Sequence, residues 1–310
     1  MRYLVTGGAG FIGSHIVDEL VRRGHEVIVL DNLSTGKREN LAGVLDKIEL
    51  IVGDITELDR VRAACRGVDY VLHQAARTSV PRSVEQPIET NRANVDGTLN
   101  VLVAAREAKA RRVVYAASSS AYGDTPTLPK SESMVATPIS PYGVSKLVGE
   151  LYAQTFGRVY GLENVSLRYF NVFGPRQDPN SPYSGVLSRF ITAILRGETP
   201  VVFGDGEQSR DFTYVANVVD ANLLACEAPH VSGMVFNVGA GGRFTLNAVL
   251  KLLERVSGKP VRAAYKPPRV GDILHSQADI QLARRNLGYE PRVGFEEGLR
   301  RTWEWYAATQ

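Results

Sequence analysis

The stretch that decides the fold is "RYLVTGGAGFIGSH", residues 2–15. A short apolar run suited to a buried strand leads directly into a glycine-rich turn, and a helical pattern begins inside that turn. Gly7, Gly10 and Gly13 form the pattern G-x-x-G-x-x-G, a variant of the dinucleotide-binding fingerprint. The first glycine makes the tight turn, the second lets the backbone approach a pyrophosphate, and the third lets helix and strand pack closely. The helix N-terminus adds positive partial charge for the phosphates.

The second predicted strand, "EVIVLD", ends in Asp31. A carboxylate at this place accepts hydrogen bonds from the adenosine ribose of a dinucleotide, which favours NAD. Lys37 and Arg38 follow closely and could hold a 2′-phosphate, so NADP is the alternative. Asp54 closes the third strand, where it could face the adenine or cap the following helix. Together with the glycines, these residues predict a dinucleotide-binding protein.

Short apolar runs alternate with helical patterns through the first half of the chain. The predicted strands are 2–6, 26–30, 48–52, 69–74, 112–118 and 165–170, and the predicted helices lie near 12–23, 57–66, 84–109 and 142–160. Near-continuous apolar strands separated by helices favour a parallel sheet covered on both faces. Right-handed crossovers then give an α/β fold with a Rossmann-type doubly wound sheet.

The composition of the chain changes after residue 170. Residues 171–185 are rich in Gly, Pro, Asn and Ser, which predicts a long loop. Helical patterns follow near 186–196, 215–227, 245–257 and 295–307, with short strands between them. We therefore predict a dinucleotide-binding domain over 1–170 and a smaller α+β lobe over 171–310, with the chain crossing between the two more than once.

Composition narrows the class of protein. The chain has 310 residues, is 44% hydrophobic and 22% charged, and has a net charge of +3, too small to suggest nucleic-acid binding. We expect Cys65 and Cys226 to pack as small apolar side chains in a reducing compartment. No Cys and His cluster has metal-ligand spacing, so we predict no metal site. The chain starts with a strand pattern and has no long apolar run, so we expect no signal peptide, no membrane span and a cytoplasmic location.

A reactive pair is predicted in "PYGVSK", where Tyr142 and Lys146 share one face of a helix that starts after Pro141. The Lys146 ammonium and a bound nicotinamide cation would both lower the pKa of Tyr142 from its usual value of about 10. Tyr142 could then exchange a proton with a substrate hydroxyl near neutral pH. Alone, this spacing is common on solvated helix faces. Ser118 strengthens the case, since it ends the fifth strand at the carboxyl edge where such sheets bind ligands.

These residues, with "HQAA" (73–76) and Asn94, resemble the extended short-chain dehydrogenase/reductases, and the resemblance runs from residue 1 to about residue 290. Within that family the chain is similar to UDP-sugar 4-epimerases, and most similar to bacterial UDP-N-acetylglucosamine 4-epimerases. The segments that carry this likeness are "DNLSTG" (31–36), "RYFNVFGPRQDPN" (168–180), "GDGEQSRDFTYV" (204–215) and "RVGDILHSQAD" (269–279).

The resemblance implies roles for individual residues. Tyr142 would be the base, Lys146 would tune it and hold the nicotinamide ribose, and Ser118 would bind the reacting oxygen. The residues implied to contact NAD are Gly7, Gly10, Phe11, Ile12, Gly13, Asp31, Asn32, Ser34, Thr35, Gly36, Asp54, Ile55, Gln74, Ala75, Ala76, Asn94, Tyr142, Lys146 and Tyr169. The residues implied to contact the UDP-sugar are Ser118, Ser120, Tyr142, Asn171, Ser184, Gly185, Val186, Arg189, Arg210, Arg269, Asp272 and Ser276.

Two arginines and an aspartate stand out among these. Arg210 and Arg269 would hold the diphosphate, for which a guanidinium fork is well suited, and Asp272 would bind the uridine ribose. On the residues alone, a surface or interdomain ion pair is the preferred explanation for both arginines.

The serine run "SSS" (118–120) bears on the reaction. Related 4,6-dehydratases carry an Asp-Glu pair at the positions of Ser119 and Ser120, and decarboxylating relatives carry a glutamate at the position of Ser120. A serine cannot replace these acids. The resemblance therefore implies reversible oxidation at C4 through a 4-keto sugar, with NAD regenerated in each cycle.

The choice of sugar depends on Ser276, which matches a position that limits pocket size in the epimerases. A small residue there admits a 2-acetamido group, so we predict interconversion of UDP-GlcNAc and UDP-GalNAc, with UDP-Glc and UDP-Gal as further substrates. The alternative for Ser276 is a helix cap or a solvent-facing position.

Two other functions stay open. One is a UDP-glucuronate 4-epimerase, with Arg82, Arg176 or Arg189 as the carboxylate partner. The other is a non-catalytic NAD-binding sensor or scaffold. The predicted helices 84–109 and 142–160 also carry surplus apolar positions, and in this family two such helices per subunit form a four-helix bundle, so we expect a homodimer.

Overall fold

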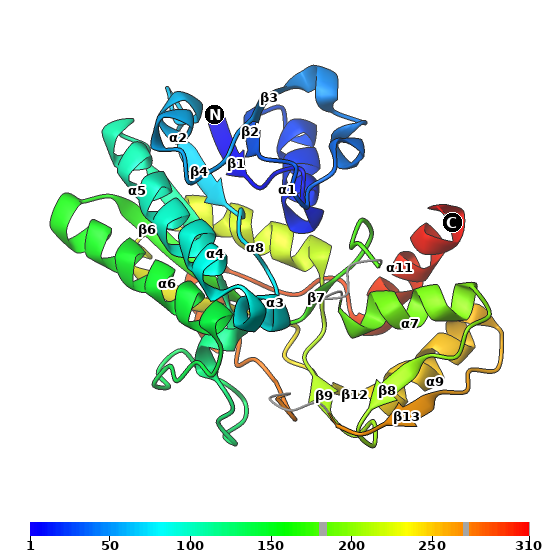
Figure 1. The fold of residues 1–310 in the computed structure, drawn as a ribbon. Coiled ribbons are helices and arrows are strands. Elements are labelled where there is room, and N and C mark those ends of the chain that lie inside the picture. Colours follow the sequence, from blue (N-terminus) through cyan, green and yellow to red (C-terminus); the bar gives the residue numbers. More distant parts are fainter. Residues whose placement is uncertain (180–184, 269–272, 310) are drawn as a thin grey trace.

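The central feature of the computed structural model, which describes residues 1–179, 185–268 and 273–309, is a seven-stranded sheet (Figure 1). Its strands are β1 (Arg2–Thr6), β2 (Glu26–Asp31), β3 (Ile48–Val52), β4 (Tyr70–His73), β5 (Arg112–Ser118), β6 (Glu163–Tyr169) and β11 (Met234–Val238). They are all parallel, in the order β11-β6-β5-β4-β1-β2-β3. The order reverses between β1 and β4, where open sheets of this kind bind ligands. The predicted doubly wound fold is confirmed.

Helices cover both faces of this sheet. One face packs against α1 (Phe11–Arg22), α8 (Val215–Glu227) and α10 (Gln281–Leu287), and the other against α2 (Leu58–Ala64), α5 (Gly97–Glu107) and α6 (Pro141–Tyr160). Successive side chains of β1 point to opposite faces of the sheet. Tyr3 and Val5 pack in the first core, and Leu4 between them packs in the second. Cys65 and Cys226 are buried and free, one in each core.

The predicted helix 84–109 is wrong as a single element. The chain forms α3 (Val80–Glu85), α4 (Pro87–Asn91), a π-helical segment (Arg92–Asp96) and then α5. Pro87 disfavours a helical backbone at the residue before it, and Gln86 accordingly has φ −134° and ψ 65°. The π segment adds a residue to the helical turn, a distortion often found at functional sites.

The smaller lobe consists of short strand pairs and three helices. β7 (Val172–Phe173) pairs with β10 (Thr213–Tyr214), β8 (Val201–Phe203) with β13 (Ala264–Lys266), and β9 (Ser209–Arg210) with β12 (Phe244–Thr245). The helices α7 (Val186–Leu195), α9 (Leu246–Ser257) and α11 (Phe295–Thr309) share an aromatic core with them, in which the Phe212 and Phe295 rings stack 5.2 Å apart. The predicted loop 171–185 thus contains a strand, because Val172 and Phe173 bury their side chains in this lobe.

The segment from α8 to β11 returns to the central sheet, with β11 beside β6. The division at residue 170 stays a prediction. The remaining short helices are η1 (Arg38–Leu41), η2 (Leu45–Lys47) and η4 (Ser119–Tyr122). Within the described ranges, no helix has both the length and the apolar character needed to span a bilayer.

Candidate active site

The glycine-rich turn has a geometry that only glycine allows. Gly7 has φ +68°, and a Cβ on it would lie 2.7 Å from the Ala75 Cα. A Cβ on Gly13 would lie 2.2 Å from the Gly7 carbonyl oxygen. Gly10 is the N-cap of α1 and has no side chain to occupy the first-turn N–H groups. The turn therefore leaves room and backbone donors for a pyrophosphate, as NAD requires.

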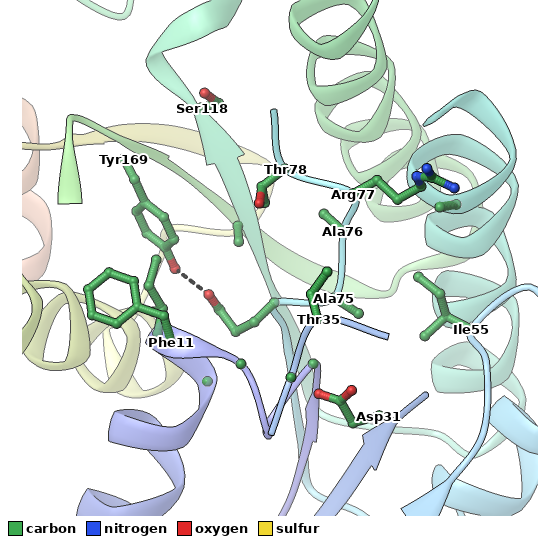
Figure 2. A pocket seen from close by; sticks show the side chains of 18 of the residues that line it. Phe11, Asp31, Thr35, Ile55, Ala75, Ala76, Arg77, Thr78, Ser118 and Tyr169 are labelled. Carbon is green, nitrogen blue, oxygen red and sulfur yellow. Dashed lines mark hydrogen bonds between the residues drawn. The ribbon is translucent and has the colours of Figure 1, made fainter. Parts of the chain in front are cut away.

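A cavity of about 450 Å³ runs along the carboxyl edge of the sheet (Figure 2). It is lined by the residues implied to contact NAD, with the exception of Asn94, and by Ser118, Ser120 and Asn171. The structure thus brings together side chains from the ends of β1, β2, β4, β5 and β6. It also adds lining residues that the sequence did not indicate, among them Arg77, Thr78 and Gln177. Arg77 and Thr78 directly follow "HQAA", which is the one signal that could have identified them.

Asp31 lies at one end of this cavity, where the sequence predicts that the adenosine ribose binds. Its carboxylate accepts hydrogen bonds from the backbone N–H of Ala9 at 2.9 Å and of Leu33 at 2.8 Å. Burial raises its pKa, and these two hydrogen bonds counteract part of that rise. Neither Lys37 nor Arg38 lines the cavity, and the Lys37 ammonium lies 3.7 Å from the Asp178 carboxylate. This arrangement fits NAD better than NADP.

Asp54 lines the cavity but does not cap α2, whose N-cap is Glu57. The Asp54 carboxylate instead accepts hydrogen bonds from the Thr56 N–H at 2.8 Å and from the Asn32 amide at 2.6 Å. The capping alternative is therefore wrong, because the chain makes one more turn before the helix begins.

Ser118, Tyr142 and Lys146 meet at the other end of the cavity. Ser140 caps α6 by accepting the Gly143 N–H at 3.1 Å, which fixes the first turn carrying Tyr142. The Lys146 ammonium donates to the Ala116 carbonyl at 2.8 Å. Burial lowers the pKa of Lys146 to about 8. These contacts hold the pair on one face of the helix, beside the end of β5.

The pKa of Tyr142 differs from the sequence-based expectation. Burial raises it, and a hydrogen bond with Ser118 acts in the opposite direction. In the protein alone the loss of solvation is the largest effect, so the expected decrease depends on the positive charge of a bound nicotinamide. Ser118 also accepts the Ser120 N–H at 3.1 Å, which starts η4 and turns the serine run along the cavity wall.

Asn94 lies behind the cavity wall rather than on it. Its amide accepts the Arg77 N–H at 2.7 Å and donates to the Arg77 carbonyl at 3.2 Å and to the Ser145 hydroxyl at 3.0 Å. The Ser145 hydroxyl in turn donates to the Tyr142 carbonyl at 2.8 Å. From the π segment, Asn94 therefore links the loop after β4 to α6, the helix that carries Tyr142 and Lys146.

A second cavity, of about 210 Å³, adjoins the first and shares Asn171, Val172 and Gln177 with it. The predicted substrate residues Gly185, Val186, Arg189 and Arg210 line it, together with Phe203 and Phe212. Arg210 donates to the Ser209 and Leu274 carbonyls at 3.0 and 2.9 Å, which orders its guanidinium. Two arginines beside aromatic walls suit an anionic group joined to a planar base. The predicted residues Ser184, Arg269 and Asp272 lie outside the described residues.

Ser276 is buried and contacts Asn171, one of the three residues shared by the two cavities. The Asn171 amide donates to the Ser276 hydroxyl at 3.2 Å and to the Asp211 carbonyl at 3.2 Å. Helix α10 begins at Gln281 with Ile280 as its N-cap, so Ser276 neither caps this helix nor faces solvent. Those two alternatives are wrong.

Among the residues that the structure describes, no group of three or more His, Cys, Asp or Glu side chains is arranged to hold a metal ion.

A Rossmann-type sheet, a glycine turn open to phosphates and a Ser-Tyr-Lys cluster on one cavity together define an NAD-dependent enzyme of the short-chain dehydrogenase/reductase class. Residues 3–239 match the NAD dependent epimerase/dehydratase family, and the chain belongs to this family.

Individual relatives agree with this assignment. The chain is 41% identical over 304 residues to a putative UDP-glucose 4-epimerase of Methanocaldococcus jannaschii, covering 97% of each chain. It is 42% identical, with a TM-score of 0.96, to the structure of a UDP-N-acetylglucosamine 4-epimerase from Methanobrevibacter ruminantium in complex with UDP-N-acetylmuramic acid, covering 100% of this chain and 99% of that one. The chain is also 39% identical, with a TM-score of 0.92, to the structure of the UDP-glucose 4-epimerase of Thermus thermophilus in complex with NAD. This match covers 100% of both chains. The predicted resemblance to UDP-sugar 4-epimerases and the expected cofactor, NAD, are confirmed.

Proposed function

We propose that this enzyme reversibly inverts C4 of UDP-N-acetylglucosamine and UDP-N-acetylgalactosamine, and that it also accepts UDP-glucose and UDP-galactose. The observation that carries the proposal is the meeting of two cavities at Asn171, Val172 and Gln177. One cavity contains Ser118, Tyr142 and Lys146, and the other contains Arg189 and Arg210 beside aromatic side chains. A UDP-sugar that spans both would place its sugar at the reactive cluster and its nucleotide at the arginines.

The chain's own residues account for the proton transfers. Tyr142 takes the proton of the C4 hydroxyl while Ser118 holds the oxygen, and Lys146 stabilises the phenolate. NAD, when bound, supplies a reversible hydride acceptor for C4. The 4-keto sugar would turn in the cavity, and Tyr142 would return the proton to the C4 oxygen when the other face of C4 is reduced. Ser119 and Ser120 line the cavity where dehydrating relatives carry acids, so the reaction stops at inversion.

The small side chain of Ser276 favours the acetylated sugar; Ser276 lines neither cavity itself but lies directly behind Asn171, which lines both. Ser276 donates or accepts hydrogen bonds only through its hydroxyl, which is held by Asn171. A 2-acetamido group needs room and polar partners of this kind.

The glucuronate alternative has less support. Of the three arginines considered for its carboxylate, only Arg189 lines either of the two adjoining cavities. Arg176 instead pairs with Asp18 of α1 at 2.6 Å. A non-catalytic role is disfavoured because Ser118, Tyr142 and Lys146 are all retained and share one cavity.

We also propose a homodimer formed through α4, α5 and α6. Large apolar side chains are exposed on this side of the molecule, with Ile88 of α4 78% exposed, and Val144 and Leu151 of α6 47% and 53% exposed. Val144 and Leu151 are two turns apart and so lie on one helix face. A second copy would cover them in a four-helix bundle. Light scattering at micromolar concentration should give twice the chain mass of 33.9 kDa.

The substrate proposal is tested by incubating the purified enzyme separately with UDP-GlcNAc, UDP-Glc and UDP-GlcA, without added NAD, and separating the products. We expect UDP-GalNAc from the first, a slower formation of UDP-Gal from the second, and no product from the third. Turnover of UDP-GlcA with none of UDP-GlcNAc would contradict the choice of sugar, and a lack of any turnover by NAD-loaded protein would contradict catalysis.

A further inference from the structure

Three side chains from distant parts of the chain form a closed hydrogen-bonded triangle at the wall of the cavity along the carboxyl edge of the sheet. Gln74 follows β4, Tyr169 ends β6, and Asn222 lies in α8, 148 residues after Gln74. The Asn222 Nδ2 lies 2.8 Å from the Tyr169 hydroxyl, the Gln74 Nε2 lies 3.0 Å from the Asn222 Oδ1, and the Tyr169 hydroxyl lies 3.2 Å from the Gln74 Oε1. Figure 2 marks this last bond at Tyr169.

The direction of these hydrogen bonds is determined by their partners. Asn222 Nδ2 also donates to the Val218 carbonyl at 2.7 Å, which fixes the amide with its nitrogen toward that carbonyl. The Tyr169 hydroxyl has one hydrogen and lies 3.0 Å from Asn222 Oδ1 as well as near Gln74 Oε1. Asn222 Oδ1 already accepts a hydrogen bond from Gln74 Nε2. The Tyr169 hydroxyl must therefore donate its hydrogen to Gln74 Oε1 if each acceptor is to have a donor. Each group thus donates to the next around the ring.

Two members of the triangle, Tyr169 and Asn222, are buried, and Gln74 is partly buried. Asn222 is fully buried, and burial raises the pKa of Tyr169 well above its usual range, so the hydroxyl stays protonated and keeps donating. Asn222 does not line the cavity, whereas Gln74 and Tyr169 do. It therefore acts on the cavity through these two side chains.

Strand order locates the triangle along the cavity. Tyr169 is the register partner of Ser118 on the neighbouring strand, and β4, which leads into Gln74, flanks β5 on its other side. The glycine turn follows β1, and Asp31 ends β2 beyond it. Figure 2 shows Ser118 and Asp31 near opposite ends of the lining. A dinucleotide with its pyrophosphate at the glycine turn and its adenosine at Asp31 therefore extends its nicotinamide half over Gln74 and Tyr169.

We propose that Asn222 is a positioning residue for the nicotinamide half of bound NAD, because from α8 it fixes the Gln74 amide and the Tyr169 phenol that form this part of the wall. Side chains that are held in place before binding lose less conformational entropy when the ligand binds. The gain in affinity is therefore expected for the half of the ligand that contacts them. The proposal needs NAD binding only, and it stands whichever UDP-sugar is the substrate.

The test compares NAD with ADP-ribose, which shares the adenosine and diphosphate but lacks nicotinamide. Both ligands are titrated calorimetrically into full-length protein freed of nucleotide, as wild type and as Asn222→Leu. We expect the Kd of NAD to rise about tenfold, the effect of losing one to two net hydrogen bonds, while that of ADP-ribose stays within about twofold.

The matched control is Asn217→Leu in the same helix. Asn217 is also fully buried, and its amide exchanges hydrogen bonds of 2.8 and 3.0 Å with the Val293 backbone, away from both cavities. This variant should lose stability but keep the wild-type ratio of the two affinities. If Asn222→Leu does not fold, Tyr169→Phe opens the same ring without changing the core volume, with the same expected result. Equal weakening of both ligands, or no weakening of NAD, would overturn the proposal.

Discussion

The proposed chemistry depends most directly on Tyr142. This residue lines the cavity at the carboxyl edge of the sheet, where its phenol lies beside Ser118. Tyr142→Phe removes the oxygen that transfers the proton and keeps the ring. We expect kcat for UDP-GlcNAc to fall by about 10²- to 10⁴-fold with little change in KM, as for other positioned acid–base groups. Initial rates by chromatography would measure this.

A suitable control for this substitution is Tyr160→Phe at the far end of the same helix, where the side chain is 52% exposed. It should retain the wild-type rate. A Tyr142→Phe variant with a rate within about twofold of wild type would show that another group moves the proton.

At the scale of elements, one arginine of the sheet forms hydrogen bonds with the C-terminal end of α8. The buried Arg112 of β5 donates from Nη1 to the carbonyls of Ala225, Cys226 and Ala228 at 2.8, 3.1 and 2.8 Å, and pairs with Glu163 at 2.6 Å. These carbonyls end the helix and have no further helical turn to bond them. Without Arg112 they would be buried with no donor.

We therefore expect Arg112→Met to lower the free energy of unfolding by about 3 kcal/mol, because unsatisfied buried acceptors are costly. Its neighbour offers the control, since Arg111 is exposed and pairs with Asp69 at 3.1 Å, so Arg111→Met should cost under about 1 kcal/mol. Denaturant unfolding of both variants measures the difference, and equal losses would argue against the capping role.

At the scale of the whole molecule, Asp211 joins three separate segments of the chain around the substrate side. Its fully buried carboxylate accepts the N–H groups of Ala240 at 2.8 Å, Gly241 at 3.0 Å and Ala278 at 3.0 Å. Its own carbonyl accepts the Asn171 amide at 3.2 Å. Burial raises the pKa of Asp211 to about 6. The three hydrogen bonds to backbone N–H groups lower this pKa and so offset part of the effect of burial.

The raised pKa predicts a pH dependence with a definite sign. The folded state binds this proton more tightly than the unfolded state, so Asp211 contributes most to stability below pH 4, and that contribution is lost as the pH rises through about 6. At about 1.4 kcal/mol per pKa unit, the loss is about 3 kcal/mol. Asp211→Asn has no such titration, so the stability of wild type relative to this variant should fall by about that amount between pH 4 and pH 7.

Denaturant unfolding across this range tests the prediction. Asp205→Asn provides the control, because this carboxylate is exposed and accepts the Glu207 N–H at 2.9 Å within its own turn. This variant makes the same substitution at the surface and serves as the reference series. A constant difference between wild type and Asp211→Asn would mean that the three N–H groups keep Asp211 ionised throughout.

The sequence by itself determined the parts that depend on local patterns. The glycine turn, the strand ending in Asp31 and the Tyr142–Lys146 spacing were predictable because strand and helix periodicity, and the backbone freedom of glycine, act within a few residues. The resemblance added the UDP-sugar residues, and all of those within the described ranges except Ser276 line at least one of the two adjoining cavities. The prediction of one continuous helix over 84–109 was wrong. The apolar pattern continues through this segment, but the helix is interrupted at Gln86, before Pro87.

Only the tertiary structure decided which distant side chains meet. Ser276 reaches Asn171, Asn94 reaches Ser145, and Asn222 reaches Gln74 and Tyr169. β11 likewise joins the central sheet from within the second half of the chain. No spacing in the sequence records these contacts, because a buried amide takes whichever donor and acceptor the packing of sheet and helices brings within about 3 Å of it.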